Sequence, residues 1–280
     1  MKQNPFSFYD FLGYLIPGAT FLYILTFIFG FNITSFFALS DGSDSSIKHE
    51  ILFFIPIIIF TYIVGHAFSL LSSFFIENFS KYFYSYPSKF LFTENHHFWF
   101  LSEKEKKHKY INIASRFFLL TSLLPISIIL FILKDLGISL FDQAKILPRN
   151  LGDIVFKKCN EILTKNLRIP KKSISCQRDI DGLGDDYFRI IYHFIFENSE
   201  KHSSKLQNYV ALYGFCRNIS FVFIVNFWLS LYFSMIEKSC CIYLTIVFAI
   251  FSFLFFTGFV KFYRRYTLEA LMGVTVFNKY

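Results

Sequence analysis

The sequence predicts an all-α membrane protein with four transmembrane helices, arranged as two hairpins around an α-helical cytoplasmic insert. Three observations lead to this class. The 280 residues are 54% hydrophobic and 22% aromatic, and their mean hydropathy is +0.44. Only 17% are charged, whereas soluble domains carry about 25%. Long uncharged apolar runs occur toward both ends of the chain. This composition excludes a disordered chain and an ordinary water-soluble enzyme.

Four apolar runs are predicted to cross the bilayer, because a spanning helix needs about 20 mostly apolar residues. They cover residues 11–31, 51–76, 219–236 and 240–260. Only three residues, 237–239, separate the last two runs, which predicts a tight antiparallel turn. An unbroken helix is expected from about residue 203 to 236, longer than the bilayer needs.

The distribution of positive charge decides how a fifth apolar run, residues 117–133, is interpreted. This run is short and has Pro125 near its centre. If it does not span, all of the 28 basic residues except Lys48 and Lys238 lie on the cytoplasmic side, as the positive-inside rule requires. If it spans, most of them are exported. We therefore expect both termini in the cytoplasm, with 117–133 re-entrant, interfacial or buried in protein.

These assignments divide the chain into three predicted domains. Residues 1–76 form an N-terminal membrane hairpin. Residues 77–210 form the cytoplasmic insert, which includes the apolar segment 117–133. Residues 211–280 form a C-terminal membrane hairpin and tail.

Basic residues gather in the middle of the predicted insert. A helix is expected there, with its apolar face made by Leu151, Ile154, Val155, Ile162 and Leu163. The candidate ligand-binding patch beside it consists of Lys157, Lys158, Lys165, Arg168, Lys171 and Lys172. Such a patch can receive the phosphates of a nucleotide or oligonucleotide. Attraction to anionic lipid headgroups is the alternative, and plain solvation of the surface is a third interpretation.

Two rows of polar residues lie at bilayer depth in the predicted helices. One row contains Gly65, His66, Ser69 and Ser73, and the other contains Asn226, Ser230 and Ser234. Polar groups in a membrane usually face a protein interior or a water path, so both rows are candidate pore linings. Small and hydroxyl-bearing residues also allow membrane helices to pack closely, and this alternative stays open.

No catalytic residue, metal site or cofactor is predicted, and the chain is not expected to be an enzyme. It contains no zinc-protease, serine-hydrolase or P-loop motif. The five cysteines, at positions 159, 176, 216, 240 and 241, lack the spacing of a metal site, and we expect them to be free thiols.

Three short segments resemble a group of bacterial membrane proteins that occur beside anti-phage defence genes. The first is 4–18, which follows the pattern F-Y-D-x-x-G-Y-x-I-P-G. The second is Ile-Val-Gly-His at 63–66, and the third is Leu-Tyr-Gly-Phe-Cys-Arg-Asn at 212–218. The resemblance covers both ends of the chain and is weaker over 77–180.

This resemblance implies a multi-pass effector of the bacterial inner membrane that makes the membrane permeable in response to a cytoplasmic signal. In the Hailong type, the channel is paired with a nucleotidyltransferase whose oligonucleotide product holds it closed. We therefore expect a homo-oligomeric, nucleotide-gated ion channel of antiviral defence, in contact with membrane lipid and paired with such an enzyme. The resemblance assigns no binding residue. The alternative is a non-conducting membrane scaffold that recruits a soluble partner enzyme.

Overall fold

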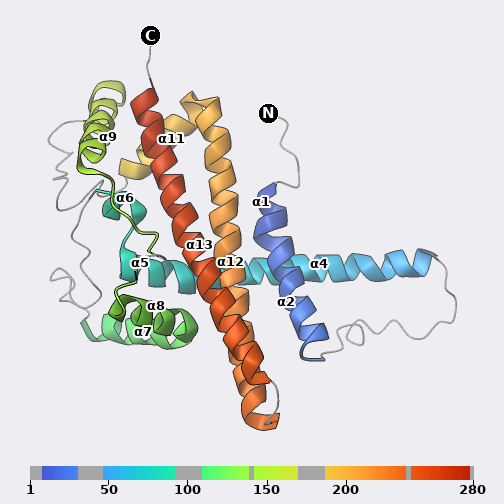
Figure 1. Cartoon of the computed structure of the whole chain (residues 1–280). Coiled ribbons are helices and arrows are strands. Elements are labelled where there is room, and N and C mark those ends of the chain that lie inside the picture. Colours follow the sequence, from blue (N-terminus) through green and yellow to red (C-terminus); the bar gives the residue numbers. More distant parts are fainter. Residues whose placement is uncertain are drawn as a thin grey trace. The chain divides into compact units, whose positions relative to one another are not determined.

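The computed structural model describes residues 8–30, 47–92, 109–138, 142–169, 187–237 and 241–277, and every element within these ranges is a helix (Figure 1). Three of the helices, Phe54–Phe90, Glu200–Ile236 and Ile242–Val276, are long and apolar enough to cross a membrane. The apolar helix Phe11–Thr26 is shorter. The all-α class is thus confirmed for the described residues, and the three long helices fit a membrane-embedded protein.

The chain divides into two compact units, which are described separately. Unit 1 contains Met1–Ile76, Leu123–Ile132 and Gly214–Phe256. Unit 2 contains Glu77–Ser122, Leu133–Tyr213 and Thr257–Tyr280. Each unit is therefore assembled from segments that are far apart in the sequence.

The first helices of unit 1 cross with their backbones in contact. Helix α1 (Phe8–Asp10) continues through the π-helical turn η1 (Phe11–Leu15) into α2 (Ile16–Phe27). Helix α4 (Ile47–Ser72) continues into a second π-helical turn, η2 (Ser73–Glu77). A Cβ atom added at Gly18 would lie 2.0 Å from the carbonyl oxygen of Thr61, and one added at Gly65 would lie 1.9 Å from that of Tyr14. Only glycine permits this approach, which is typical of close helix packing in membranes.

The two longest helices are α12 (Glu200–Glu237, 38 residues) and α13 (Cys241–Val276, 36 residues). The predicted unbroken helix over 203–236 is confirmed. Helix α13 continues beyond the expected end at residue 260, because Leu271 and Val274 in its last turns are buried. At 1.5 Å per residue each helix is about 55 Å long, whereas the hydrocarbon core measures about 30 Å.

In unit 1, α12 and α13 run antiparallel and are joined by hydroxyl groups. Ser220 Oγ donates a hydrogen bond to the Ser252 carbonyl oxygen at 2.8 Å. The hydroxyl groups of Ser230 and Thr245 lie 2.9 Å apart. An apolar core of Ile24, Phe227 and Phe248 lies nearby in the same unit.

The fifth apolar run forms two helices instead of one. Helix α7 (Lys109–Ser122) ends before Leu123, and α8 (Leu124–Asp135) follows with a bend of 95°. Pro125 is the second residue of α8, where its missing N–H costs no helical hydrogen bond. The 117–133 run is therefore not one straight helix.

Unit 2 holds the remaining helices. They are α5 (Asn78–Tyr84), α6 (Pro87–Phe90), α9 (Arg149–Glu161) with the π-helical turn η4 (Ile162–Asn166), and α11 (Tyr187–Asn198). Ile191 and Ile195 of α11 are fully buried, and an added Cβ at Gly273 of α13 would lie 2.7 Å from Ile195. Close packing against α13 fixes the orientation of α11.

Candidate functional site

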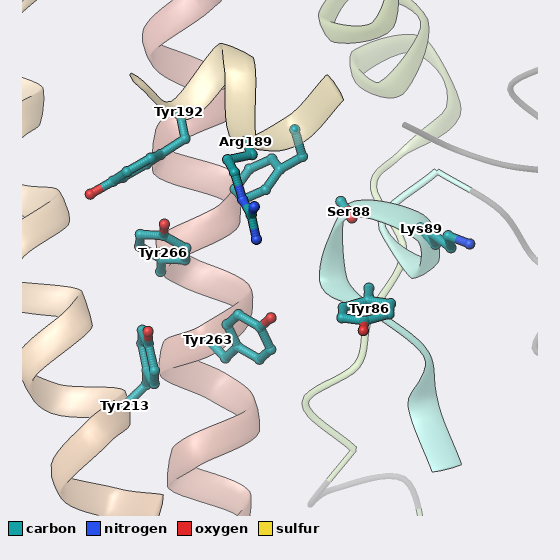
Figure 2. A pocket seen from close by; sticks show the side chains of 9 residues that line it. Tyr86, Ser88, Lys89, Arg189, Tyr192, Tyr213, Tyr263 and Tyr266 are labelled. Atoms are coloured by element: carbon teal, nitrogen blue, oxygen red, sulfur yellow. The ribbon is translucent and has the colours of Figure 1, made fainter. Parts of the chain in front are cut away.

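A cavity of about 450 Å³ lies within unit 2, in the size range of small-molecule sites. Segments from four parts of the chain line it: residues 86–89 at α6, 188–192 on α11, and single turns of α12 and α13. Its lining residues are Tyr86, Ser88, Lys89, Phe188, Arg189, Tyr192, Tyr213, Tyr263 and Tyr266. Figure 2 shows these side chains around the pocket.

The aromatic rings of the pocket form a connected wall centred on Tyr266. Its ring centroid lies 5.4 Å from that of Tyr192, 5.7 Å from that of Tyr213 and 6.1 Å from that of Phe188. Tyr213 and Tyr263 are 5.3 Å apart by the same measure. These separations are those of favourable aromatic pairs, so the wall is held in place by its own contacts. Flat π-faces of this kind can stack against a planar ligand.

Arg189 provides the positive charge of the pocket. Its side chain extends from α11 into the space between Tyr266 and Tyr86, whereas the ammonium group of Lys89 points away from these tyrosines (Figure 2). Among the described residues, Arg189 forms no ion pair with a carboxylate. Its side chain is exposed, so the planar guanidinium group is accessible to an anionic ligand and suits bidentate recognition of phosphate.

Hydroxyl groups complete the lining. Burial raises the pKa of Tyr192 above its ordinary value, although the hydrogen bond that its hydroxyl accepts from Tyr266 acts in the opposite direction. Tyr192 is therefore neutral at physiological pH, and its hydroxyl group can donate a hydrogen bond to a ligand. Aromatic faces, one guanidinium group and neutral hydroxyl groups together suit a ligand with an aromatic ring and a phosphate.

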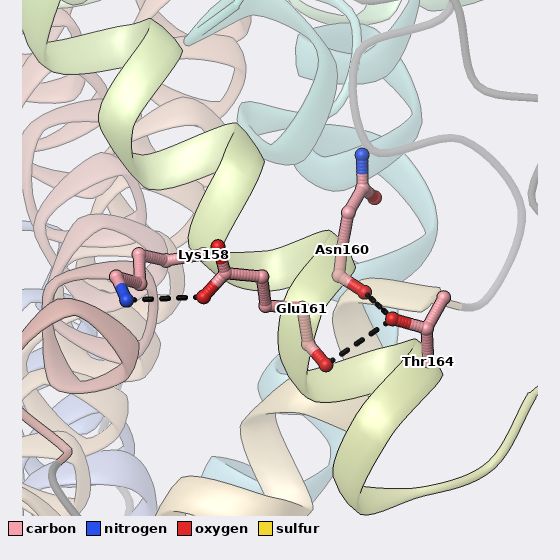
Figure 3. A network of polar contacts seen from close by, with 4 residues as sticks. All are labelled: Lys158, Asn160, Glu161 and Thr164. Atoms are coloured by element: carbon pink, nitrogen blue, oxygen red, sulfur yellow. Dashed lines mark hydrogen bonds and ion pairs between the residues drawn. The ribbon is translucent and has the colours of Figure 1, made fainter.

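The predicted basic patch lies elsewhere in unit 2, on α9 and η4. Lys157, Lys158, Lys165 and Arg168 are all exposed. Lys158 Nζ donates a hydrogen bond to Glu161 Oε2 at 3.0 Å (Figure 3). This bond lowers the pKa of Glu161, and the charges of Lys158, Lys165 and Lys157 lower it further. The described part of the patch is thus an exposed helix surface with a carboxylate at its centre.

The other three residues around the end of the patch differ from these lysines in what the structure describes. Lys171 and Lys172 lie outside the described residues. Arg168 has a φ of +53°, and the Ile169 N–H bonds the Leu163 carbonyl oxygen at 2.9 Å, a pattern that ends a helix. Arg168 therefore has a local structural role in addition to its charge.

The first predicted pore row lies at the crossing of η1 and α4. The His66 ring stacks on Tyr14 with centroids 3.8 Å apart, and the Tyr62 ring meets it edge-on at 4.5 Å. Ser69 is buried and its Oγ accepts a hydrogen bond from Arg217 Nη2 at 3.3 Å. Ser73 is half-buried, and Gly65 makes the backbone contact described above.

The second predicted row lies mostly inside the chain. Asn226 and Ser230 are fully buried, and Ser234 is half-buried. Asn226 Nδ2 donates to the Val222 carbonyl oxygen of its own helix at 2.8 Å. Its Oδ1 is buried and has no hydrogen-bond partner among the described residues. Lining a water path would require the helices around this row to rotate or separate.

The remaining candidate chemistry is limited. Cys159 and Cys216 are free and buried, and burial raises the pKa of the Cys159 thiol to about 12. Within the described ranges, no three His, Cys, Asp or Glu side chains group as metal ligands.

No protein-family model, curated protein or solved structure matches this chain.

Proposed function

We propose that the protein is an oligomeric ion channel of the bacterial inner membrane, gated from the cytoplasm by a nucleotide or oligonucleotide, and that it acts in anti-phage defence. The observation that carries the proposal is the presence, in one chain, of three candidate spanning helices and an aromatic pocket that contains Arg189. A nucleotidyltransferase partner is the proposed source of the ligand.

The charge distribution along α12 and α13 supports a membrane position for only part of each helix. Residues 218–236 and 242–260 contain no Asp, Glu, Lys or Arg. Arg217 stands directly before the first stretch and Lys261 directly after the second. Each stretch is about one bilayer core in length. The pocket residues Tyr213, Tyr263 and Tyr266 then belong to the parts that protrude into the cytoplasm.

The proposal includes four spanning segments, with 11–31 as the first, and both termini in the cytoplasm. Two positions distinguish this topology from the alternatives. In a variant without native cysteines, a cysteine introduced at position 44 should react with a membrane-impermeant maleimide added outside spheroplasts. A cysteine at position 165 should react only after the membrane is permeabilised, because the positive-inside rule retains the basic insert. External labelling at 165 would place 117–133 across the membrane.

Conduction can be measured directly. Liposomes that contain the purified protein should release potassium ions when no ligand is present. A short single-stranded DNA oligonucleotide should change the rate of this potassium release. A monomeric protein that conducts under neither condition would favour the membrane scaffold instead.

The two polar rows yield a prediction about the pore. His66→Leu and Asn226→Leu should each reduce ion release several-fold, because water in a pore needs polar groups along its wall. Met235→Leu is the matched control, since Met235 is on α12 and highly exposed. The measurement is fluorescence of a potassium dye, with size-exclusion chromatography to verify assembly. If both variants assemble and conduct like the wild type, these rows are packing surfaces only.

A further inference from the structure

The three segments quoted for the family resemblance come together at one place in unit 1. A Cβ added at Gly214 would lie 3.3 Å from the ring of Tyr9. Gly65 contacts the backbone of Tyr14, and His66 stacks on the ring of Tyr14. Residues near positions 9–18, 63–66 and 212–218 therefore form one structural junction between η1, α4 and α12.

A buried polar cluster holds this junction together. Asn218 Nδ2 donates to the Gly13 carbonyl oxygen at 2.6 Å. The Ser72 hydroxyl donates to Asn218 Oδ1, and Arg217 Nε donates to Ser72 Oγ at 3.1 Å. Asn218 and Ser72 are fully buried, and Arg217 is 7% exposed. The Asn218 amide thus connects α12 to both of the other helices.

Both π-helical turns of unit 1 lie beside this cluster. Gly13 is the middle residue of η1, and Ser72 directly precedes η2. A π-helical turn contains one residue more than an α-helical turn, is rare, and occurs frequently at functional sites. Conversion of such a turn to α-helix changes the register of the adjoining helix by one residue, which rotates its side chains by about 100°.

We propose that Arg217 and Asn218 form a latch that keeps η1 and η2 in the π-helical state, and that release of the latch converts both turns together. Side chains in a buried network stabilise one another, and a half-broken network leaves polar atoms unpaired in an apolar surrounding. Partial release is therefore unfavourable, and the two turns should change as a pair. The π-to-α conversion would rotate the row that contains His66.

The link to ligand binding rests on the proposed function. Tyr213, which lines the pocket, precedes Arg217 by four residues in α12, which is about one helical turn. A ligand that moves Tyr213 therefore acts on the same helix one turn from the latch. The latch itself needs neither a ligand nor ion flow, so it can be tested independently.

Hydrogen–deuterium exchange of the full-length protein in nanodiscs tests the latch. Asn218→Leu removes both interhelical bonds of the amide while keeping the number of side-chain heavy atoms. Exchange should become at least tenfold faster in peptides covering 9–18 and 70–80. Asn226→Leu is the matched control, because Asn226 is equally buried in α12 but bonds its own helix, and exchange in these peptides should stay at the wild-type rate.

Ser72→Ala provides the decisive second variant, because the change is small and the protein should fold. A latch predicts that this change in α4 also speeds exchange in 9–18, on a different helix. Faster exchange in 70–80 alone would overturn the proposal, as would wild-type exchange in both variants or an equal increase in every peptide. The latch is tested by hydrogen–deuterium exchange, which does not depend on conduction. Absence of potassium release from liposomes would therefore contradict the proposed channel but not the latch.

Discussion

Arg189→Ala is expected to weaken binding of a short oligonucleotide by at least tenfold. The guanidinium group is the positive charge that points into the tyrosine-lined pocket. A charge-assisted hydrogen bond contributes about 1.5–3 kcal/mol, and each 1.4 kcal/mol changes affinity about tenfold. The dissociation constant can be measured by fluorescence anisotropy with a labelled oligonucleotide and detergent-solubilised protein. Tyr266→Leu should also weaken binding, because it removes the ring at the centre of the stacking wall.

Two further variants distinguish binding in the pocket from attraction of the oligonucleotide to positive charge elsewhere on the protein. Lys165→Gln removes one exposed positive charge outside the pocket and should leave the dissociation constant within about twofold, since exposed charges are strongly screened. The pair Lys157→Gln and Lys158→Gln tests the basic patch. If this pair weakens binding and Arg189→Ala does not, the ligand binds on α9. If the wild type binds vesicles of anionic lipid but no oligonucleotide, and Arg189→Ala weakens that binding, the pocket receives a lipid headgroup.

Gly65→Ala is expected to destabilise the protein more than any other single methyl addition discussed here. The new Cβ would lie 1.9 Å from the Tyr14 carbonyl oxygen, and a backbone atom cannot move aside as a flexible side chain can. Overpacking commonly costs about 1–3 kcal/mol and occasionally more. We expect about 3 kcal/mol, which corresponds to a fall in Tm of roughly 10 °C for a chain of this size. Thermal unfolding in detergent, followed by intrinsic fluorescence, measures the shift.

Gly13→Ala is the control for the crossing. It lies on the facing helix and is buried, but an added Cβ would be 3.6 Å from the nearest atom, on the Tyr9 ring. This is ordinary van der Waals contact, so Tm should change by no more than about 3 °C. A similar Tm for Gly65→Ala and the wild type would show that the two backbones do not touch in solution.

The long helices were predictable because their sequence signal is composition summed over many residues. Residues 203–236 contain no proline, and the described helix covers them without a break. The π-helical turns were not predictable, because one additional residue in a turn does not change the amino-acid composition of the helix in a recognisable way. Within α9, Ile154 was expected on the apolar face but is 55% exposed. Val155 is buried as expected, and Cys159, which was not assigned to that face, is buried as well.

The pocket was missed for a different reason. Its lining comes from four short segments that are far apart in the sequence, and no spacing rule connects them. Tyrosine is a weak signal in a chain with 17 of them. Arg189 belongs to none of the motifs or patches that the sequence suggested. The available signal was Tyr263 and Tyr266 beside the basic residues Lys261, Arg264 and Arg265, a combination that is also typical of anchoring at the membrane surface.

The bend between α7 and α8 has a consequence for which of its backbone groups need water. At Leu123 the carbonyl oxygen accepts two hydrogen bonds, from the Ser127 N–H at 2.9 Å and from Ser127 Oγ at 3.0 Å. Backbone groups that a bend leaves unpaired need water or another polar partner, and the core of a bilayer supplies neither. Here the bend satisfies the Leu123 carbonyl group within the chain, and Leu123, Pro125 and Ile126 are buried. In an apolar surrounding, this corner therefore needs no water molecule to pair that carbonyl group.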